Sequence, residues 1–157
     1  MTRKAKPRMR IPPRPAYTLS GREVFVPRDF TGMRNALLVA FDRSHLVAFP
    51  SWRAALREAL LARTGTGFYA ALLLGEPFPL RRRLLEWAMR LEIQDPFERE
   101  HIALLYCNVA DWLTAAGRPP TDEPLLVVTL TDGSVLATSP GFPDPRKTAL
   151  ISDALIR

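Results

Sequence analysis

The strongest constraint on the fold is an Asp132-Gly133 pair between two apolar runs near the C-terminus, residues 124–130 and 135–138. This pattern predicts a tight hairpin, because a type I′ turn needs positive φ at both central residues. A helix is expected next, since Asp144 can accept hydrogen bonds from the first turn and Pro145 suits the first helical position. The chain therefore ends as strand, turn, strand and helix.

Earlier apolar runs predict strands in the interior of a sheet. Residues 36–41 and 68–74 lack polar alternation, as strands do when helices cover both faces. Residues 101–106 predict a third, shorter strand. An extended hairpin is expected over residues 19–27, around Gly21.

Apolar residues at helical spacing separate these strands. One predicted helix covers residues 52–60, and a second covers residues 80–91, with its arginines mostly on a solvated face. Asn108 is placed to cap a short helix that ends at Gly117. We expect buried stripes on the second and last helices: Leu80, Leu84, Trp87, Ala88 and Leu91, and Leu150, Ile151, Ala154 and Leu155.

The order of elements predicts an α/β fold. Helices between strands require parallel crossovers, and the hairpin adds an antiparallel pair. We expect a mixed five-stranded sheet with helices on both faces and the strand at residues 36–41 in its middle, plus an N-terminal β-hairpin and a basic tail. The expected division is a flexible, basic, proline-rich tail at residues 1–16 and one domain at residues 17–157.

The net charge of +6 comes from the start of the chain. Six basic residues precede Tyr17 with no acidic residue among them, and the rest of the chain carries 16 basic and 16 acidic residues. The tail is either a solubilising arm or an arm that contacts polyanions such as nucleic acid or an anionic membrane face. Its charged residues are Arg3, Lys4, Lys6, Arg8, Arg10 and Arg14.

Cysteine use and hydropathy indicate the compartment. Cys107 is the single cysteine, so no intramolecular disulfide forms and a reducing compartment is favoured. No apolar run approaches the ~20 residues that span a bilayer. The N-terminus has no apolar h-region, so no secretory signal is expected. We expect a cytoplasmic protein without a membrane span.

In order and residues, the chain resembles thioredoxin-like domains of the peroxiredoxin-type layout over residues 18–157. The resemblance begins with residues 19–27, Gly32 and residues 36–41. It is closer to a bacterial thioredoxin-like group related to the mitochondrial ATP-synthase assembly factor. The segments that carry it are Phe41-Asp-Arg-Ser-His45 with Trp52, Met89-Arg90-x-x-Ile93-x-Asp95, Arg99-Glu100-His101, Leu105-Tyr106 and Asp132-Gly133.

The chain departs from this superfamily in the segment that carries the superfamily's catalytic cysteines. The resemblance places a Cys-x-x-Cys or a Thr-x-x-Cys after the strand at residues 36–41, but residues 42–50 contain no cysteine. Thiol–disulfide exchange needs a thiolate, so neither activity carries over. Cys107 is interpreted as a small buried apolar residue rather than a nucleophile. The assembly-factor relatives, which hold a protein partner without a redox pair, imply a binding role.

Two segments form the candidate site. Asp42, Arg43, Ser44 and His45 follow the strand at residues 36–41 and provide either an anion site at a helix start or a helix cap. The resemblance also implies a cis proline at Pro124 beside this loop, with Glu123 before it; a trans proline that begins a strand is the alternative. A peptide groove is expected between the two segments.

The predicted function is protein or peptide binding in this groove, by a binding module rather than an enzyme. Polyanion binding through the tail and a non-thiol enzyme in the same groove are the alternatives. His45 and His101 are the only histidines and no Cys–His spacing suggests zinc, so neither metal nor cofactor is expected. The protein partner and the oligomeric state are not indicated by the sequence.

Overall fold

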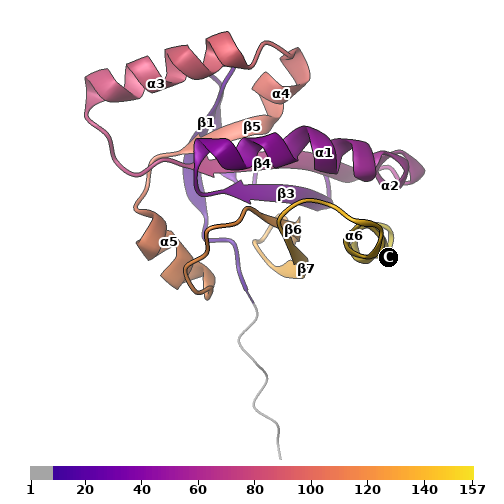
Figure 1. Ribbon diagram of the computed structural model, residues 1–157. Coiled ribbons are helices and arrows are strands. Elements are labelled where there is room, and N and C mark those ends of the chain that lie inside the picture. Colours follow the sequence, from indigo (N-terminus) through magenta and orange to yellow (C-terminus); the bar gives the residue numbers. More distant parts are fainter. Residues whose placement is uncertain (1–8) are drawn as a thin grey trace, which may run out of the picture.

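The computed structural model describes residues 9–157 (Figure 1). Seven strands form one sheet in the order β2-β1-β5-β4-β3-β6-β7. β3, β4 and β5 are parallel, and β6 and β7 add an antiparallel pair beside β3. The strands are β1 (Arg14–Thr18), β2 (Glu23–Val26), β3 (Arg34–Ala40), β4 (Thr66–Leu73), β5 (Ile102–Leu105), β6 (Leu125–Leu130) and β7 (Val135–Pro140).

The expected five-stranded sheet is wrong in its strand number. The N-terminal hairpin, β1 and β2, does not stand apart: β1 pairs antiparallel with β5, and Tyr17 lies opposite Leu104. Edge strands expose unpaired N–H and C=O groups, and this pairing satisfies those of β5. Within β5-β4-β3-β6-β7, β3 is central, as predicted.

Helices cover both faces of the sheet, as the sequence predicts. They are α1 (Ala48–Ala55), α2 (Arg57–Ala62), α3 (Pro79–Glu92), α4 (Pro96–His101), α5 (Val109–Ala116) and α6 (Pro145–Ile156), with a 3₁₀ turn, η1 (Arg43–Val47), before α1. None of them, within residues 9–157, has the length and hydropathy needed to cross a membrane.

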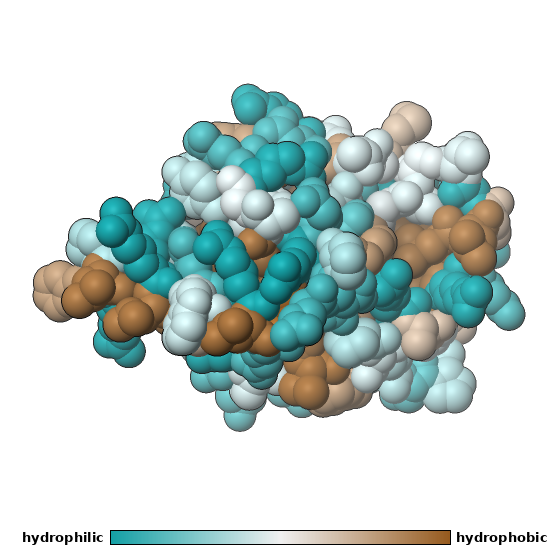
Figure 2. Space-filling view, turned by 90° about the horizontal axis from the view of Figure 1, so that it is seen from above, coloured by the Kyte–Doolittle hydropathy of each residue, from teal (hydrophilic) through white to brown (hydrophobic). Residues whose placement is uncertain are grey.

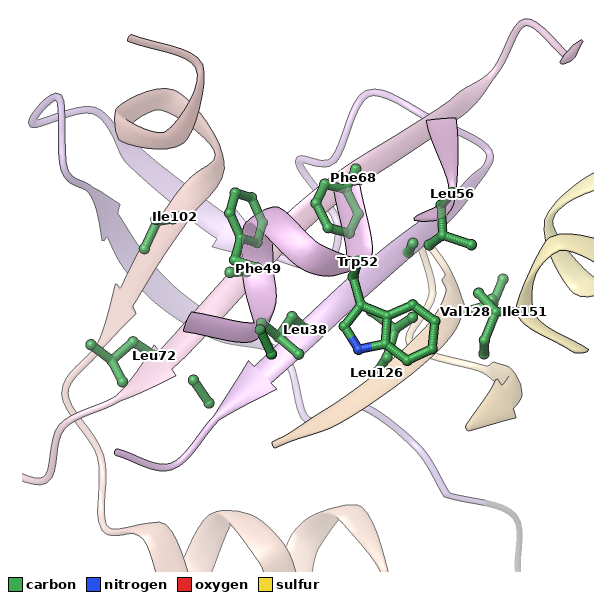
Figure 3. Close-up of a cluster of buried hydrophobic side chains, with 14 of the residues drawn as sticks. Leu38, Phe49, Trp52, Leu56, Phe68, Leu72, Ile102, Leu126, Val128 and Ile151 are labelled. Carbon is green, nitrogen blue, oxygen red and sulfur yellow. The ribbon is translucent and has the colours of Figure 1, made fainter. Parts of the chain in front are cut away.

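Alternate residues of the central strands enter two separate cores. Leu38 of β3 packs with Phe49 and Trp52 of α1 and with Ile151 of α6 (Figure 3). Leu37, its neighbour, points to the opposite face, where α5 contributes its buried side chains. Successive side chains of a strand point to opposite faces, so an unbroken apolar run fills both cores.

Residues 9–16 belong to the fold, although the sequence predicted a flexible tail there. Ile11 is buried, and its N–H donates to the Gly133 carbonyl at 2.9 Å. The Arg10 N–H donates to the Ala116 carbonyl at 3.2 Å, and Arg14 begins β1. The other four charges assigned to the tail, Arg3, Lys4, Lys6 and Arg8, lie outside the described residues.

The C-terminal hairpin is confirmed, but its turn is not type I′. Gly133 has φ +94°, whereas no residue other than glycine has positive φ in residues 9–157. The Gly133 N–H donates to the Leu130 carbonyl at 3.0 Å. A positive-φ glycine after a type I turn is the usual form of a slightly longer hairpin loop. As predicted, the Asp144 side chain accepts from the Lys147 N–H at 2.8 Å and Pro145 begins α6.

Two further predictions need correction, the start of the third strand and the buried face of α6. Residue 101 was expected in a strand but ends α4, which Asp95 caps through the Phe97 N–H. Leu150 of α6 is exposed, while Ile151 and Leu155 are buried. An Asp followed by a Pro at the first helical position predicted the start of α6. Asp95-Pro96 is the same pattern, so α4 was also predictable from the sequence.

The stripe predicted to bury α3 faces outward instead. Leu80, Leu84, Trp87 and Leu91 are 70%, 56%, 62% and 55% exposed. Met89 is the one buried residue of α3. The opposite side of α3 faces the body through Met89 and through a hydrogen-bonded group of polar side chains described below.

Candidate functional site

The candidate loop begins with a helix cap. The Asp42 carboxylate accepts a hydrogen bond from the Ser44 N–H at 2.7 Å, and this bond is the main cause that lowers the Asp42 pKa. Asp42 thus precedes η1 in the role that the cap interpretation assigned to it. Its side chain is committed to the turn, and η1, at five residues, is too short to serve as an anion-binding helix start.

Arg43 reaches from this loop to the end of α3. Its guanidinium contacts the Glu92 carboxylate at 2.7 Å, with both side chains well exposed. An exposed ion pair of this kind contributes about 0–1 kcal/mol. The pair therefore fixes the position of two charges at the surface more than it stabilises the domain.

His45 joins the loop to the turn before β6. Its Nδ1 accepts from the Phe41 N–H at 3.0 Å, so Nε2 carries the ring proton and donates to the Asp122 carbonyl at 2.8 Å. Both ring nitrogens are used in structural bonds. His45 thus holds the two candidate segments together.

Glu123 and Pro124 lie next to that bridge. Glu123 is exposed and Pro124 is buried. The Pro124 carbonyl accepts from the Gly141 N–H at 2.8 Å. Val26–Pro27 is the cis peptide bond of the described residues, so the bond before Pro124 is trans. Pro124 therefore lacks the cis bond that the resemblance implied, and its carbonyl supports the β6–β7 end.

The open surface of the loop lies on its other side, toward α3. A hollow of about 290 Å³ is lined there by Arg43 and Ser44, with an apolar lining that includes Met89 and Ile93 and a charged rim that includes Glu92. Of the six predicted site residues, only Arg43 and Ser44 line it. The bond from His45 to the Asp122 carbonyl joins the loop to the turn before β6 and occupies the space between them.

Cys107 lies away from this loop, at the end of β5. It is half-buried, and burial raises the pKa of its thiol. A cavity of about 470 Å³ beside it also contains Arg14, Glu76 and Asp111. Since the thiolate is the reactive form, a raised pKa opposes nucleophilic chemistry. Within residues 9–157, no three His, Cys, Asp or Glu side chains gather closely enough to hold a metal ion.

Sequence reasoning missed a polar cluster that holds α3 to the sheet. The Tyr106 hydroxyl donates to Glu86 at 2.5 Å, and Arg82 pairs with Glu86 at 3.4 Å while its guanidinium stacks 3.8 Å from the Tyr106 ring. Arg90 adds a bond to the Leu19 carbonyl at 2.9 Å. The Arg82–Glu86 spacing of four residues was the available signal, because it places both side chains on one face of a helix.

Neither a family model nor a curated protein matches the chain. Solved structures do match. The exposed lipoprotein thioredoxin Etrx1 of Streptococcus pneumoniae has 13% identity and a TM-score of 0.57, with 92% of this chain and 98% of that one covered. BsSco, a member of the Sco family of cytochrome c oxidase assembly proteins, has 11% identity and a TM-score of 0.59, with 94% and 92% covered.

A third match is the thioredoxin domain of a thiol-disulfide oxidoreductase from Bacteroides vulgatus. It has 16% identity and a TM-score of 0.55, and 98% of this chain and 94% of that one are covered. At such identities the similarity shows the fold alone. The chain therefore has a thioredoxin-like α/β fold, and these matches do not extend to the ATP-synthase assembly-factor group.

Proposed function

We propose that this thioredoxin-like domain acts by binding a protein partner, without thiol redox chemistry. The observation that carries the proposal is the segment after β3, where the resemblance places catalytic cysteines. Residues 42–50 contain none. Asp42 caps η1 and His45 bonds to Asp122, so these side chains serve the structure.

The proposed binding surface is the hollow between the loop and α3. Its apolar lining and charged rim suit a peptide segment, since recognition sites combine apolar contact with a few placed polar groups. The role is the one implied by the resemblance to the assembly-factor group. The cytoplasm is the proposed compartment, because a single cysteine suits a reducing environment.

The redox half of the proposal is tested with purified protein. We expect no reduction of insulin disulfides and no peroxide consumption above the rate of a free-thiol control. The matched variant is Cys107→Ser, which should behave like the wild type. Turnover that disappears in Cys107→Ser would make Cys107 a nucleophile and overturn the proposal.

The binding half is tested by charge reversal at the rim. Arg43→Glu should lower partner capture, because it places two carboxylates together where Arg43 now pairs with Glu92. The matched control is Arg146→Glu, an exposed position in α6. Equal capture by both variants, at unchanged stability, would exclude the hollow as the binding surface.

Polyanion binding through the six basic residues remains a second proposal. Arg10 donates to the Asp132 carbonyl and Arg14 lies in β1, so a deletion must stop before residue 9 to leave the fold intact. Removal of residues 1–8 should abolish salt-dependent DNA or RNA binding. Full binding by the shortened protein would exclude the segment as the polyanion site.

A further inference from the structure

The outward stripe of α3 is an apolar surface that no other element of residues 9–157 covers. Figure 2 looks down on the side of the molecule where α3 lies, and apolar side chains gather there at the surface. Four large exposed residues lie on one helix. Contiguous exposed apolar surface of this kind marks interaction sites. The stripe consists of Leu80, Leu84, Trp87 and Leu91, and we call it the α3 seam.

The α3 seam has the spacing of a coiled-coil interface. The steps from Leu80 to Leu91 are four, three and four residues, which places Leu84 and Leu91 at a positions and Leu80 and Trp87 at d positions of a heptad. At 3.6 residues per turn the four side chains fall within an arc of about 60°. A stripe limited to a and d is the narrow seam that a second helix covers.

Arginines border the α3 seam on both sides. The e position after Leu80 is Arg81, and the g positions before Leu84 and Leu91 are Arg83 and Arg90. Arg81 and Arg83 form no ion pair with any residue between 9 and 157. The acidic residues of α3, Glu86 and Glu92, lie at c and b and pair elsewhere. Charges at e and g select the partner.

The charges beside the α3 seam decide which kind of partner can cover it. A second copy offers these arginines no acidic partner: Arg83 would face Arg90 in an antiparallel pair and Ala88 in a parallel pair. Residues 1–8 carry four further positive charges and no acidic residue. An anionic bilayer would satisfy the arginines, but interfacial helices bury a wider apolar face than this seam offers. An amphipathic protein helix with acidic e and g positions matches both the width and the charge.

We infer that the α3 seam docks an amphipathic helix of a partner protein that has apolar a and d residues and Glu or Asp at e and g. The inference names the partner class for protein binding and rests on that proposed function, but it uses a surface separate from the hollow at Arg43. Leu80 and Trp87 provide the d-position contacts, and Arg81 and Arg83 select the acidic flanks.

The fluorescence of Trp87 reports peptide binding at the α3 seam. Trp87 is 62% exposed, whereas Trp52 and Trp112 are at most 1% exposed, so a blue shift of the emission on titration reports burial of Trp87. The probe is a synthetic three-heptad peptide with Leu at a and d and Glu at e and g. The control peptide has Lys in place of each Glu. We expect saturable binding of the acidic peptide, weakened by salt, and at least about tenfold weaker binding of the basic one.

Two matched sets of variants test the seam in the full chain. Leu84→Gln should abolish the shift, and Leu61→Gln should keep it, because Leu61 is also exposed, at 76% against 56% for Leu84, but lies on α2. Arg81→Glu combined with Arg83→Glu should reverse the preference between the two peptides. Unchanged preference in that double variant, or no binding by the wild type, would overturn the inference.

The alternative occupants are tested with the same protein. A dimer in sedimentation velocity that is lost in Leu84→Gln, or a Trp87 shift with phosphatidylglycerol vesicles but not with the acidic peptide, would also overturn it. These failures leave the non-redox binding proposal standing. Turnover that requires Cys107 would overturn that proposal while peptide binding at the seam persisted, so the two failures are distinguishable.

Discussion

Two helices with the same sequence pattern meet opposite environments in this fold. α1 and α3 each carry a tryptophan among apolar residues at helical spacing. Trp52 of α1 is 0% exposed, and Trp87 of α3 is 62% exposed. α1 lies against the central strands, whereas α3 lies farther out, beside α4 (Figure 1).

The difference arises from what the other face of each helix offers. α1 has one apolar face, and its Trp52 indole donates to the Gly141 carbonyl at 2.9 Å inside the core. α3 has a second inward face, formed by Met89 and by the Arg82–Glu86 pair that meets Tyr106. Helical periodicity therefore predicts an apolar stripe, but it does not decide which face of the helix meets the sheet.

The largest effect is expected at the buried tryptophan. Trp52→Ala should lower the free energy of unfolding by about 3–5 kcal/mol, because it leaves a cavity between α1 and the sheet. Its loss also leaves the Gly141 carbonyl without this donor. Urea denaturation measures the change, with Trp87→Ala as the matched control. Similar losses of unfolding free energy in both variants would show that the α3 seam is buried. The contrast between the environments of α1 and α3 would then be wrong.

The inward face of α3 should come next. Met89→Ala should cost about 2–4 kcal/mol, because Met89 is 1% exposed and packs against the core beneath α1. Urea denaturation again reports the loss, and Leu91→Ala on the outward face serves as the control. A loss confined to Leu91→Ala would mean that α3 is turned over relative to the fold described above.

Sequence reasoning predicted the elements of this fold better than their surroundings. The apolar run at residues 36–41, the Asp-Gly hairpin and the Asp144-Pro145 start are local signals, and each led to the correct element. The pairing of β1 with β5 depends on residues more than 80 positions apart in sequence. No local pattern in the hairpin specifies that partner, so the seven-stranded sheet was not predictable from it.

The candidate site shows the same limit. The cap at Asp42 follows from residue type and position, and the structure contains it. The His45 bond to Asp122 and the Arg43 pair with Glu92 join segments about 80 and 50 residues apart. These contacts place Arg43 toward α3 and occupy the space that the sequence assigned to a groove. Only the three-dimensional path of the chain determines them.

The polar attachment of α3 should have a smaller and pH-dependent effect. Tyr106→Phe removes the hydrogen bond to Glu86 and should cost about 1 kcal/mol, since the site is partly open to solvent. Burial, followed by Glu86, raises the pKa of Tyr106. A raised pKa favours the protonated form in the fold, so this stability is present below about pH 10, the ordinary value for tyrosine, and is lost as pH rises above it.

Denaturation at several pH values checks the sign. The difference between the wild type and Tyr106→Phe should be constant from pH 6 to pH 9 and should shrink above pH 10. A difference that grows at high pH would mean that the phenolate is stabilised, most directly by Arg82. The attachment of α3 would then rest on Arg82 rather than on the Glu86 bond.

The smallest effect is expected on the α3 seam itself. Leu84→Ala removes an exposed side chain and keeps a good helix former, so stability should change by no more than about 0.5 kcal/mol. Leu56→Ala is the matched control: Leu56 is 0% exposed between α1 and α2, and its loss should cost about 2–4 kcal/mol. Both are measured by urea denaturation at one protein concentration and again at a tenfold lower one. A cost above 1 kcal/mol for Leu84→Ala that disappears on dilution would show that a second copy covers the seam, because only an intermolecular contact depends on concentration.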